Sequence, residues 1–264
     1  MKKAISEERL LAICDEIPTT EILSINILKT ATYQQWHFNI ERAKAIAAIW
    51  DFKKVGSLQV SLRDGQYWVV DGQHRLAAAV IKKLSSLKCD VMHGLTYEEE
   101  AYLFATQNDN RRLLPRLSKF WALVEAKDPE ALKIKEAVES AGLEISKNGA
   151  AAQNKIVAIN TLMIIYKQVG GIGLFRVLNL INKTYNGATQ SLEKKMLLGV
   201  NIFLKTYGEE ADEKIFINQL RKVEPSVIIR EGDSDMSTGY SKYAKVILRR
   251  YNYGRSKRLP SKFE

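Results

Sequence analysis

The chain has 264 residues, of which 46% are hydrophobic and 27% are charged, a composition typical of a folded globular protein and not of a disordered chain. Its most apolar stretch, 156–166, is shorter than the roughly 20 residues of a membrane span, and residues 1–9 lack the apolar core of a signal peptide. The two cysteines, Cys14 and Cys89, do not have metal-site spacing. We therefore expect a cytoplasmic protein with no membrane segment, no structural disulfide and no metal site built from cysteines.

The net charge of +10 is concentrated at the C-terminal end. Residues 241–264 hold eight of the 40 basic residues and one of the 30 acidic residues, which leaves 32 basic and 29 acidic residues, or +3, in residues 1–240. A concentrated basic segment is typical of a protein that binds DNA or RNA, and the alternative is a solvated end that promotes solubility. The candidate nucleic-acid-binding residues are Lys245, Arg249, Arg250, Arg255, Lys257 and Arg258.

In the first 115 residues, helical and alternating hydrophobic patterns succeed each other. Asp64-Gly65 lies between two alternating stretches and predicts a hairpin turn, and Thr96-x-x-Glu99 predicts a capping box. Helices are predicted over 5–16, 41–52, 76–84 and 96–107, and strands over 21–27, 58–62, 67–70 and 87–92.

After Pro115 no strand pattern persists, and 226–239 is predicted to be a loop because it is polar and contains glycine. The predicted fold class is therefore α+β, with a small mixed sheet and its helices followed by an all-α half. The expected domains are 15–115, a helical domain 116–240, and a basic helix and tail 241–264. Helices are predicted over 117–127, 129–141, 154–167, 173–184, 192–207, 212–223 and 241–251.

The sequence Asp71-Gly72-Gln73-His74-Arg75 joins a predicted strand to a predicted helix. A glycine at the end of a strand allows close approach of a ligand, and the N–H groups and dipole of the next helix favour an anion such as phosphate. Arg75 could add a bidentate contact and His74 a further donor. The alternative is that Asp71 caps the helix, with His74 and Arg75 exposed in its first turn.

In the order of these motifs, residues 15–125 resemble the ParB-like domain of the ParB/sulfiredoxin superfamily. The resemblance implies a superfamily fold and a nucleotide, CTP or ATP, bound with Mg²⁺. Gly72 and Arg75 fall on the turn that holds phosphates in ParB proteins, and Asn108 and Arg111 fall on the later segment that helps to hold metal and phosphate. The chain looks closest to a branch with an Asp-Gly-Gln-His-Arg turn that is common on phages and mobile elements.

Three departures limit what the resemblance implies. The arginine expected after the first strand is absent, since the segment reads Tyr33-Gln34-Gln35-Trp36. Gln73 replaces the reactive cysteine of sulfiredoxins, so sulfinic-acid reduction is not expected, and Gln107 replaces the metal-linked glutamate of ParB, so any nucleotide hydrolysis should be slow. A related branch phosphorylates free serine, and Glu21 or Glu41 would be the general base of such an enzyme here.

The leading interpretation is a ParB-like, nucleotide-binding protein associated with DNA, which could form a homodimer. There are two alternatives. One is a small-molecule kinase or a nuclease that uses the same phosphate site, and the other is an adaptor that has lost nucleotide binding. If the protein is an enzyme, we expect it to be a weak nucleotide hydrolase or a phosphotransferase. Glu21 or Glu41 beside the turn would favour the kinase, and Arg75 paired with an internal carboxylate would favour the adaptor.

Overall fold

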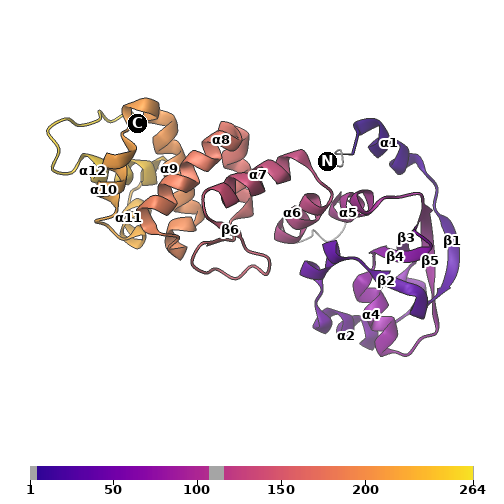
Figure 1. The fold of residues 1–264 in the computed structure, drawn as a ribbon. Helices are drawn as coiled ribbons and strands as arrows, with labels where there is room; N and C mark the ends of the chain where they lie inside the picture. The colour runs from indigo at the N-terminus through magenta and orange to yellow at the C-terminus, as the bar shows by residue number, and fades with distance from the viewer. Residues whose placement is uncertain (1–4, 107–115, 264) are drawn as a thin grey trace. The chain divides into compact units, whose positions relative to one another are not determined.

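A computed structural model describes residues 5–106 and 116–263 of the chain (Figure 1). The chain divides into two compact units, Met1–Ala131 and Leu132–Glu264. The first unit extends past the expected boundary at residue 115, because α6 (Arg116–Glu125) packs against α5 (Tyr97–Thr106) and against the 3-10 helix Thr32–His37.

The first unit is built on a five-stranded mixed sheet with the strand order β1-β5-β3-β4-β2. β1 pairs with β5 and β3 with β4 in antiparallel fashion, whereas β2 pairs with β4 and β3 with β5 in parallel. The predicted hairpin is confirmed, since Arg63 of β3 pairs with Gln66 of β4 across Asp64-Gly65. The strands are β1 (Thr19–Ser24), β2 (Leu28–Thr30), β3 (Leu58–Arg63), β4 (Gln66–Asp71) and β5 (Ser86–His93).

A hydrophobic core lies on each face of this sheet, because successive side chains of a strand point to opposite faces. Val69 of β4 belongs to the cluster that includes Leu76 and Ala79 of α4. The next residue, Val70, belongs to the cluster with Phe104 of α5 and Ala122 of α6. The sheet is therefore packed between α4 on one side and α5 with α6 on the other. The remaining helices of this unit are α1 (Glu7–Asp15), α2 (Ile40–Ala48), α3 (Phe52–Val55) and α4 (Gln73–Ile81).

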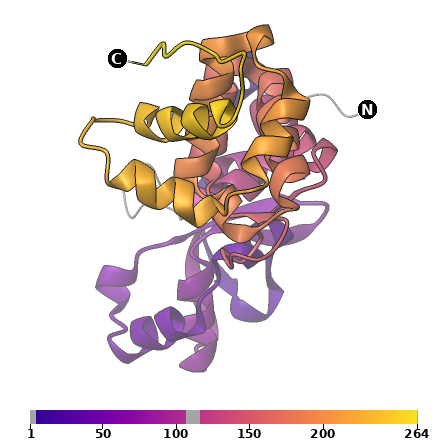
Figure 2. The same ribbon diagram turned by 90° about the vertical axis from the view of Figure 1, so that its left-hand side faces the viewer.

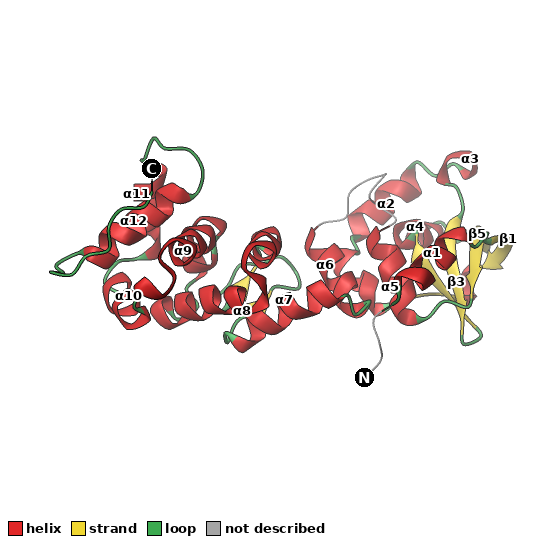
Figure 3. Cartoon of the chain, turned by 90° about the horizontal axis from the view of Figure 1, so that it is seen from above, coloured by secondary structure: helices red, strands yellow, loops and turns green. Residues whose placement is uncertain are grey.

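The second unit is largely helical (Figures 2 and 3). α12 packs against α9, α10 and α11, and it buries Tyr243, Val246, Ile247 and Tyr251. The predicted basic helix is thus confirmed as a helix, but it belongs to the core of this unit. The helices are α7 (Pro129–Ser140, which begins at the end of the first unit), α8 (Ile159–Tyr185), α9 (Lys194–Tyr207), α10 (Glu213–Leu220), α11 (Pro225–Asp233) and α12 (Ser241–Asn252).

Gly170 interrupts α8 with a left-handed backbone conformation, φ 68° and ψ −175°. Two separate helices were predicted for this region, and the interruption at Gly170 agrees with that prediction. Among the described residues, α8 is the one helix long and apolar enough to cross a membrane by length and composition. A core helix of a globular protein can have the same length and composition.

The predicted fold class is confirmed: a mixed sheet with helices is followed by a helical half. Several predictions of local structure were wrong. Residues 25–27, expected at the end of a strand, form a 3-10 helix, and residues 155–156, expected at the start of a helix, form a short strand. Residues 225–233, expected within a loop from 226, form α11, which has Pro225 at its first turn and buries Ile228. The helical half also holds a two-stranded parallel pair, β6 (Glu144–Ile145) with β7 (Lys155–Ile156), and these strands are too short to produce an alternating pattern.

Candidate functional site

Gly72 forms the turn between β4 and α4. Its φ of 107° lies in the left-handed region, and it is the N-cap residue of α4. A Cβ atom at this position would lie only 2.4 Å from Cδ2 of Leu58, so the packing and the backbone conformation both require glycine. Among the described residues, no side chain caps this helix, which leaves its positive N-terminal end available to an anion. The alternative that Asp71 caps the helix is wrong.

Arg75 is held by three oxygen atoms of the protein itself. Its Nη1 donates to the carbonyl oxygens of Val55 at 2.9 Å and Ser57 at 2.7 Å, and its Nη2 donates to Oδ2 of Asp71 at 3.0 Å. The Asp71 and Arg75 side chains are 32% and 19% exposed, so this ion pair is partly shielded from water. Arg75 therefore ties the segment between α3 and β3 to the Gly72 turn, and its contact with phosphate stays a prediction.

Gln73 and His74 are buried, in contrast to the alternative that His74 is exposed. Nε2 of His74 accepts a hydrogen bond from the backbone N–H of Asn39 at 3.0 Å, and its ring stacks on Phe38 with the centroids 5.5 Å apart. Nε2 of Gln73 donates to the carbonyl oxygen of Gln34 at 3.4 Å. Both side chains thus fasten the segment that leads into α2 beside the turn.

A groove of about 680 Å³ runs along α4 and begins at Gln73, the residue that follows Gly72. Five residues at helical spacing form one wall, and they are Gln73, Leu76, Ala77, Val80 and Ile81. The opposite wall consists of Thr30, Ala31, Thr32, Phe38 and Ile40. The groove is mainly apolar, with the hydroxyl groups of two threonines near it and an uncapped helix end at its start. This combination fits a small ligand with an apolar body and an anionic group.

The sequence analysis did not identify this groove, although the spacing of the apolar residues of α4 could have indicated its wall. Arg75 lies two residues after Gln73 on α4, so it faces roughly 200° away around the helix from Gln73. It therefore points to the opposite side from the groove, where Val55 and Ser57 lie.

Of the two candidate general bases, only Glu41 lies near the turn. Glu21 is on β1, which is separated from β4 by β5 and β3 and thus lies roughly 14 Å away at about 4.8 Å per strand. Glu41 is in the first turn of α2, two residues after Asn39, which bonds to His74. Its Oε1 accepts from Nζ of Lys44 at 2.9 Å. Asn108 and Arg111, like Gln107, lie outside the described residues.

A family model described as "Family of unknown function (DUF6551)" matches residues 29–263. The chain belongs to this family. Among solved structures, this DUF6551 protein is similar to a Pnob8-like ParB-N domain, with 15% identity, 89% of this chain and 94% of that chain covered, and a TM-score of 0.43. No curated protein is detectably similar to the chain.

Two further solved structures are similar at low identity. One is the C-terminally truncated ParB from Caulobacter crescentus complexed with CTP-gamma-S, with 13% identity, 68% of this chain and 99% of that chain covered, and a TM-score of 0.32. The other is sulfiredoxin from Arabidopsis thaliana, with 19% identity, 29% and 88% covered, and a TM-score of 0.25. These proteins are of the superfamily that the sequence motifs predicted, and the likeness is one of fold. The Asp-Gly-Gln-His-Arg branch stays a prediction.

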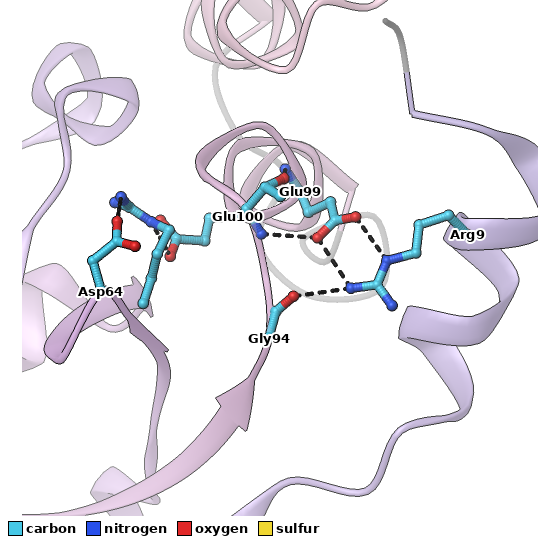
Figure 4. Close-up of polar contacts among 7 residues, drawn as sticks. Arg9, Asp64, Gly94, Glu99 and Glu100 are labelled. Atoms are coloured by element: carbon cyan, nitrogen blue, oxygen red, sulfur yellow. Dashed lines mark hydrogen bonds and ion pairs between the residues drawn. The ribbon is translucent and has the colours of Figure 1, made fainter. Parts of the chain in front are cut away.

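A second polar cluster of the DUF6551 protein lies around the start of α5 (Figure 4). Glu100 is fully buried, and its Oε1 accepts from Nε of Arg63 at 3.0 Å. Burial raises the pKa of the Glu100 carboxyl group, although the bond from Arg63 acts in the opposite direction. The Arg63 guanidinium also lies 4.9 Å from the centroid of the Trp68 ring. This pair supports the packing of α5 on the sheet, and Arg63 was not among the candidate site residues that the sequence indicated.

The six candidate nucleic-acid-binding residues have unequal surroundings. Arg250 forms an ion pair with Glu231, and the Arg255 guanidinium lies 4.6 Å from the centroid of the Tyr251 ring. Lys257 is exposed. Three of the six line one groove of about 680 Å³, and they are Lys245, Arg249 and Arg258.

Proposed function

We propose that the first unit binds a nucleotide in the groove along α4, with its phosphates at the Gly72 turn. The observation that carries this proposal is the uncapped, positive end of α4 at the start of an apolar groove of about 680 Å³. The apolar walls would hold the base and sugar, and the backbone N–H groups of the first turn of α4 would hold phosphate oxygens. Arg75 would act by positioning the turn.

The nucleotide would be CTP or ATP with Mg²⁺, as the motif resemblance implies. The described residues contain no group of three or more His, Cys, Asp or Glu side chains that could hold a metal ion. The described side chains therefore fit Mg²⁺ only as an ion that the nucleotide phosphates bring with them, since Mg²⁺ is commonly bound through substrate phosphates and few carboxylates. Its contribution would be to neutralise the phosphate charge.

The same proposal includes association with DNA, because basic side chains gather on the second unit. A homodimer, a cytoplasmic location and an origin on phages or mobile elements stay predictions of the sequence analysis.

An adaptor without a nucleotide is the second candidate function. It is favoured by the Asp71–Arg75 ion pair, in which the guanidinium group is satisfied by the protein itself. A kinase has weaker support, because Glu41 lies near the turn but pairs with Lys44.

Calorimetry with CTP, ATP, GTP and UTP, each with Mg²⁺, distinguishes these functions. We expect at least one nucleotide to bind the wild-type chain. Ala77→Glu should weaken that binding by about tenfold or more, because the new carboxylate would fill part of the groove and repel phosphate. Ala45→Glu, at an exposed position of α2 that does not line the groove, is the matched control and should bind normally. If the wild-type chain binds none of the four, the adaptor is the better interpretation.

A further inference from the structure

We propose that the groove beside α12 is a binding site for single-stranded nucleic acid, with Tyr253 as the platform on which a base stacks. The inference rests on the nucleic-acid part of the proposed function and adds the site and the class of ligand. It does not depend on the nucleotide site of the first unit.

Three cations line this groove, and among the described residues two of them, Lys245 and Arg258, form no ion pair with a carboxylate. Lys245 and Arg249 come from α12, and Arg258 comes from the segment that follows. Arg249 is 63% exposed and lies 3.9 Å from Glu231, which already pairs with Arg250. The groove has one acidic lining residue, Asp235, whose Oδ1 accepts from the backbone N–H of Ser237 at 2.9 Å. The groove is therefore net positive and suits a chain of phosphates.

Other basic residues of the C-terminal segment are engaged within the protein. Lys262 donates to Glu210 at 2.6 Å, Arg250 pairs with Glu231, and Arg255 packs on the Tyr251 ring. These contacts hold the segment in place, so the positive charge at the groove is presented by a fixed structure.

The loop that carries Tyr253 is fastened at both ends. The side chain of Asn252 accepts the N–H of Leu259 at 2.9 Å and donates to its carbonyl oxygen at 2.8 Å. Nε2 of Gln219 donates to the carbonyl oxygen of Tyr253 at 3.0 Å. The Tyr253 residue itself is 74% exposed. A rigid loop with an exposed aromatic ring loses little conformational entropy when a base stacks on it.

Stacking decides between single-stranded and duplex ligands. A single strand can place an unpaired base on Tyr253 while its phosphates contact Lys245, Arg249 and Arg258. The bases of a duplex are already stacked within the helix, so a duplex would gain only the phosphate contacts.

Fluorescence anisotropy of the full-length chain with oligo-dT, oligo-rU and a duplex DNA of equal length tests the proposal. We expect one or both single strands to bind more tightly than the duplex, and the comparison of dT with rU identifies the sugar. Tyr253→Ala should weaken single-strand binding by about fivefold or more, and Tyr253→Phe should retain it. Lys245→Gln with Arg258→Gln should lower the salt slope for single strands by about 1.4, at roughly 0.7 per phosphate contact.

Two controls separate this site from other effects. Lys205→Gln with Lys214→Gln removes two exposed lysines of the same unit outside the groove and should leave the salt slope unchanged. Ala77→Glu should leave oligonucleotide binding unchanged, so a failure of the nucleotide site is not mistaken for a failure of this one. The proposal is overturned if the chain binds duplex as tightly as single strands, or if Tyr253→Ala binds like the wild type. In either case a general DNA association could still hold.

Discussion

Gly72 and Arg75 stand three residues apart but serve the turn before α4 in different ways. Gly72 provides a backbone conformation and a space that no side chain could share with Leu58. Arg75 provides three hydrogen bonds that join Val55, Ser57 and Asp71. The type of residue at each position could be interpreted from the sequence, but the partners of Arg75 could not, because two of them are backbone atoms about twenty positions away.

Arg75→Lys should destabilise the first unit even though the charge is kept. An ammonium group cannot reproduce the planar arrangement that reaches two carbonyl oxygens and a carboxylate together. We expect the free energy of unfolding to fall by about 1–3 kcal/mol, measured by urea denaturation. Arg116→Lys, at an exposed position of α6, is the control and should unfold like the wild type.

Cys89 should be unreactive in the folded protein. It is fully buried in β5, and burial, followed by the nearby charge of Asp90, raises the pKa of its thiol to about 11. The thiolate is the reactive form, so at pH 8 only about one thiol in a thousand would be ionised. In a Cys14→Ser variant, which leaves Cys89 as the one thiol, a thiol reagent should react slowly until denaturant is added. Rapid reaction without denaturant would contradict the burial of Cys89.

At the scale of single elements, α5 shows how local sequence can determine structure. Its capping box was predicted and is confirmed: the N–H of Thr96 donates to Oε2 of Glu99 at 2.8 Å, and the N–H of Glu99 donates to Oγ1 of Thr96 at 3.3 Å. Arg9 of α1 adds a bond from its Nε to Oε1 of Glu99 at 2.8 Å. The capping box involves residues three apart and is visible in the sequence, whereas the bond from Arg9 spans ninety positions and is not.

The bond between Arg9 of α1 and Glu99 of α5 should be sensitive to acid. Burial acts to raise the pKa of the Glu99 carboxyl group, but the bonds from Arg9 and Thr96 outweigh burial, and the pKa is lowered from the ordinary value of 4.5. A lowered pKa means that the stabilisation is present above about pH 4.5 and is lost as the pH falls through the value in the folded protein. We expect Glu99→Gln to lower stability at pH 7 by about 1 kcal/mol, since Arg9 is partly exposed, and to reduce the loss of stability on acidification. Thermal unfolding between pH 3 and pH 7 measures both effects.

Elements that depend on distant partners were harder to predict. β2 has three residues and exists because it pairs with β4 in parallel. α11 was missed because polar residues and glycine dominate its sequence, although Ile228 is buried when the helix packs on α12. In both cases the element is stabilised by a tertiary contact, which the local sequence pattern does not indicate.

At the scale of the whole molecule, the basic residues of the C-terminal segment differ in their surroundings. The sequence predicted the amount and location of their charge, but it treated the basic residues as equivalent. In the structure they are not equivalent, because Arg250 pairs with Glu231 and Arg255 packs on the Tyr251 ring. These partners could not be identified from the sequence.

Replacing both Arg250 and Arg255 with glutamine should therefore affect folding more than nucleic-acid binding. We expect a loss of about 1–2 kcal/mol in the free energy of unfolding, since a partly buried ion pair and a cation–π contact are removed. The salt slope for oligo-dT should stay within about 0.5 of the wild-type value, because Lys245, Arg249 and Arg258 remain. A slope that falls by about 1.4, as two lost contacts require, would show that both residues bind phosphate.

The left-handed conformation of Gly170 also limits what α8 can do beside a lipid bilayer. A continuous helix over Ile159–Tyr185 would extend about 40 Å at 1.5 Å per residue and could cross the hydrocarbon layer of about 30 Å. The break leaves segments 159–169 and 171–185, which extend about 17 and 22 Å, so neither reaches from one side to the other. The backbone conformation of Gly170 therefore divides α8 into two segments, and neither segment is long enough to cross a bilayer.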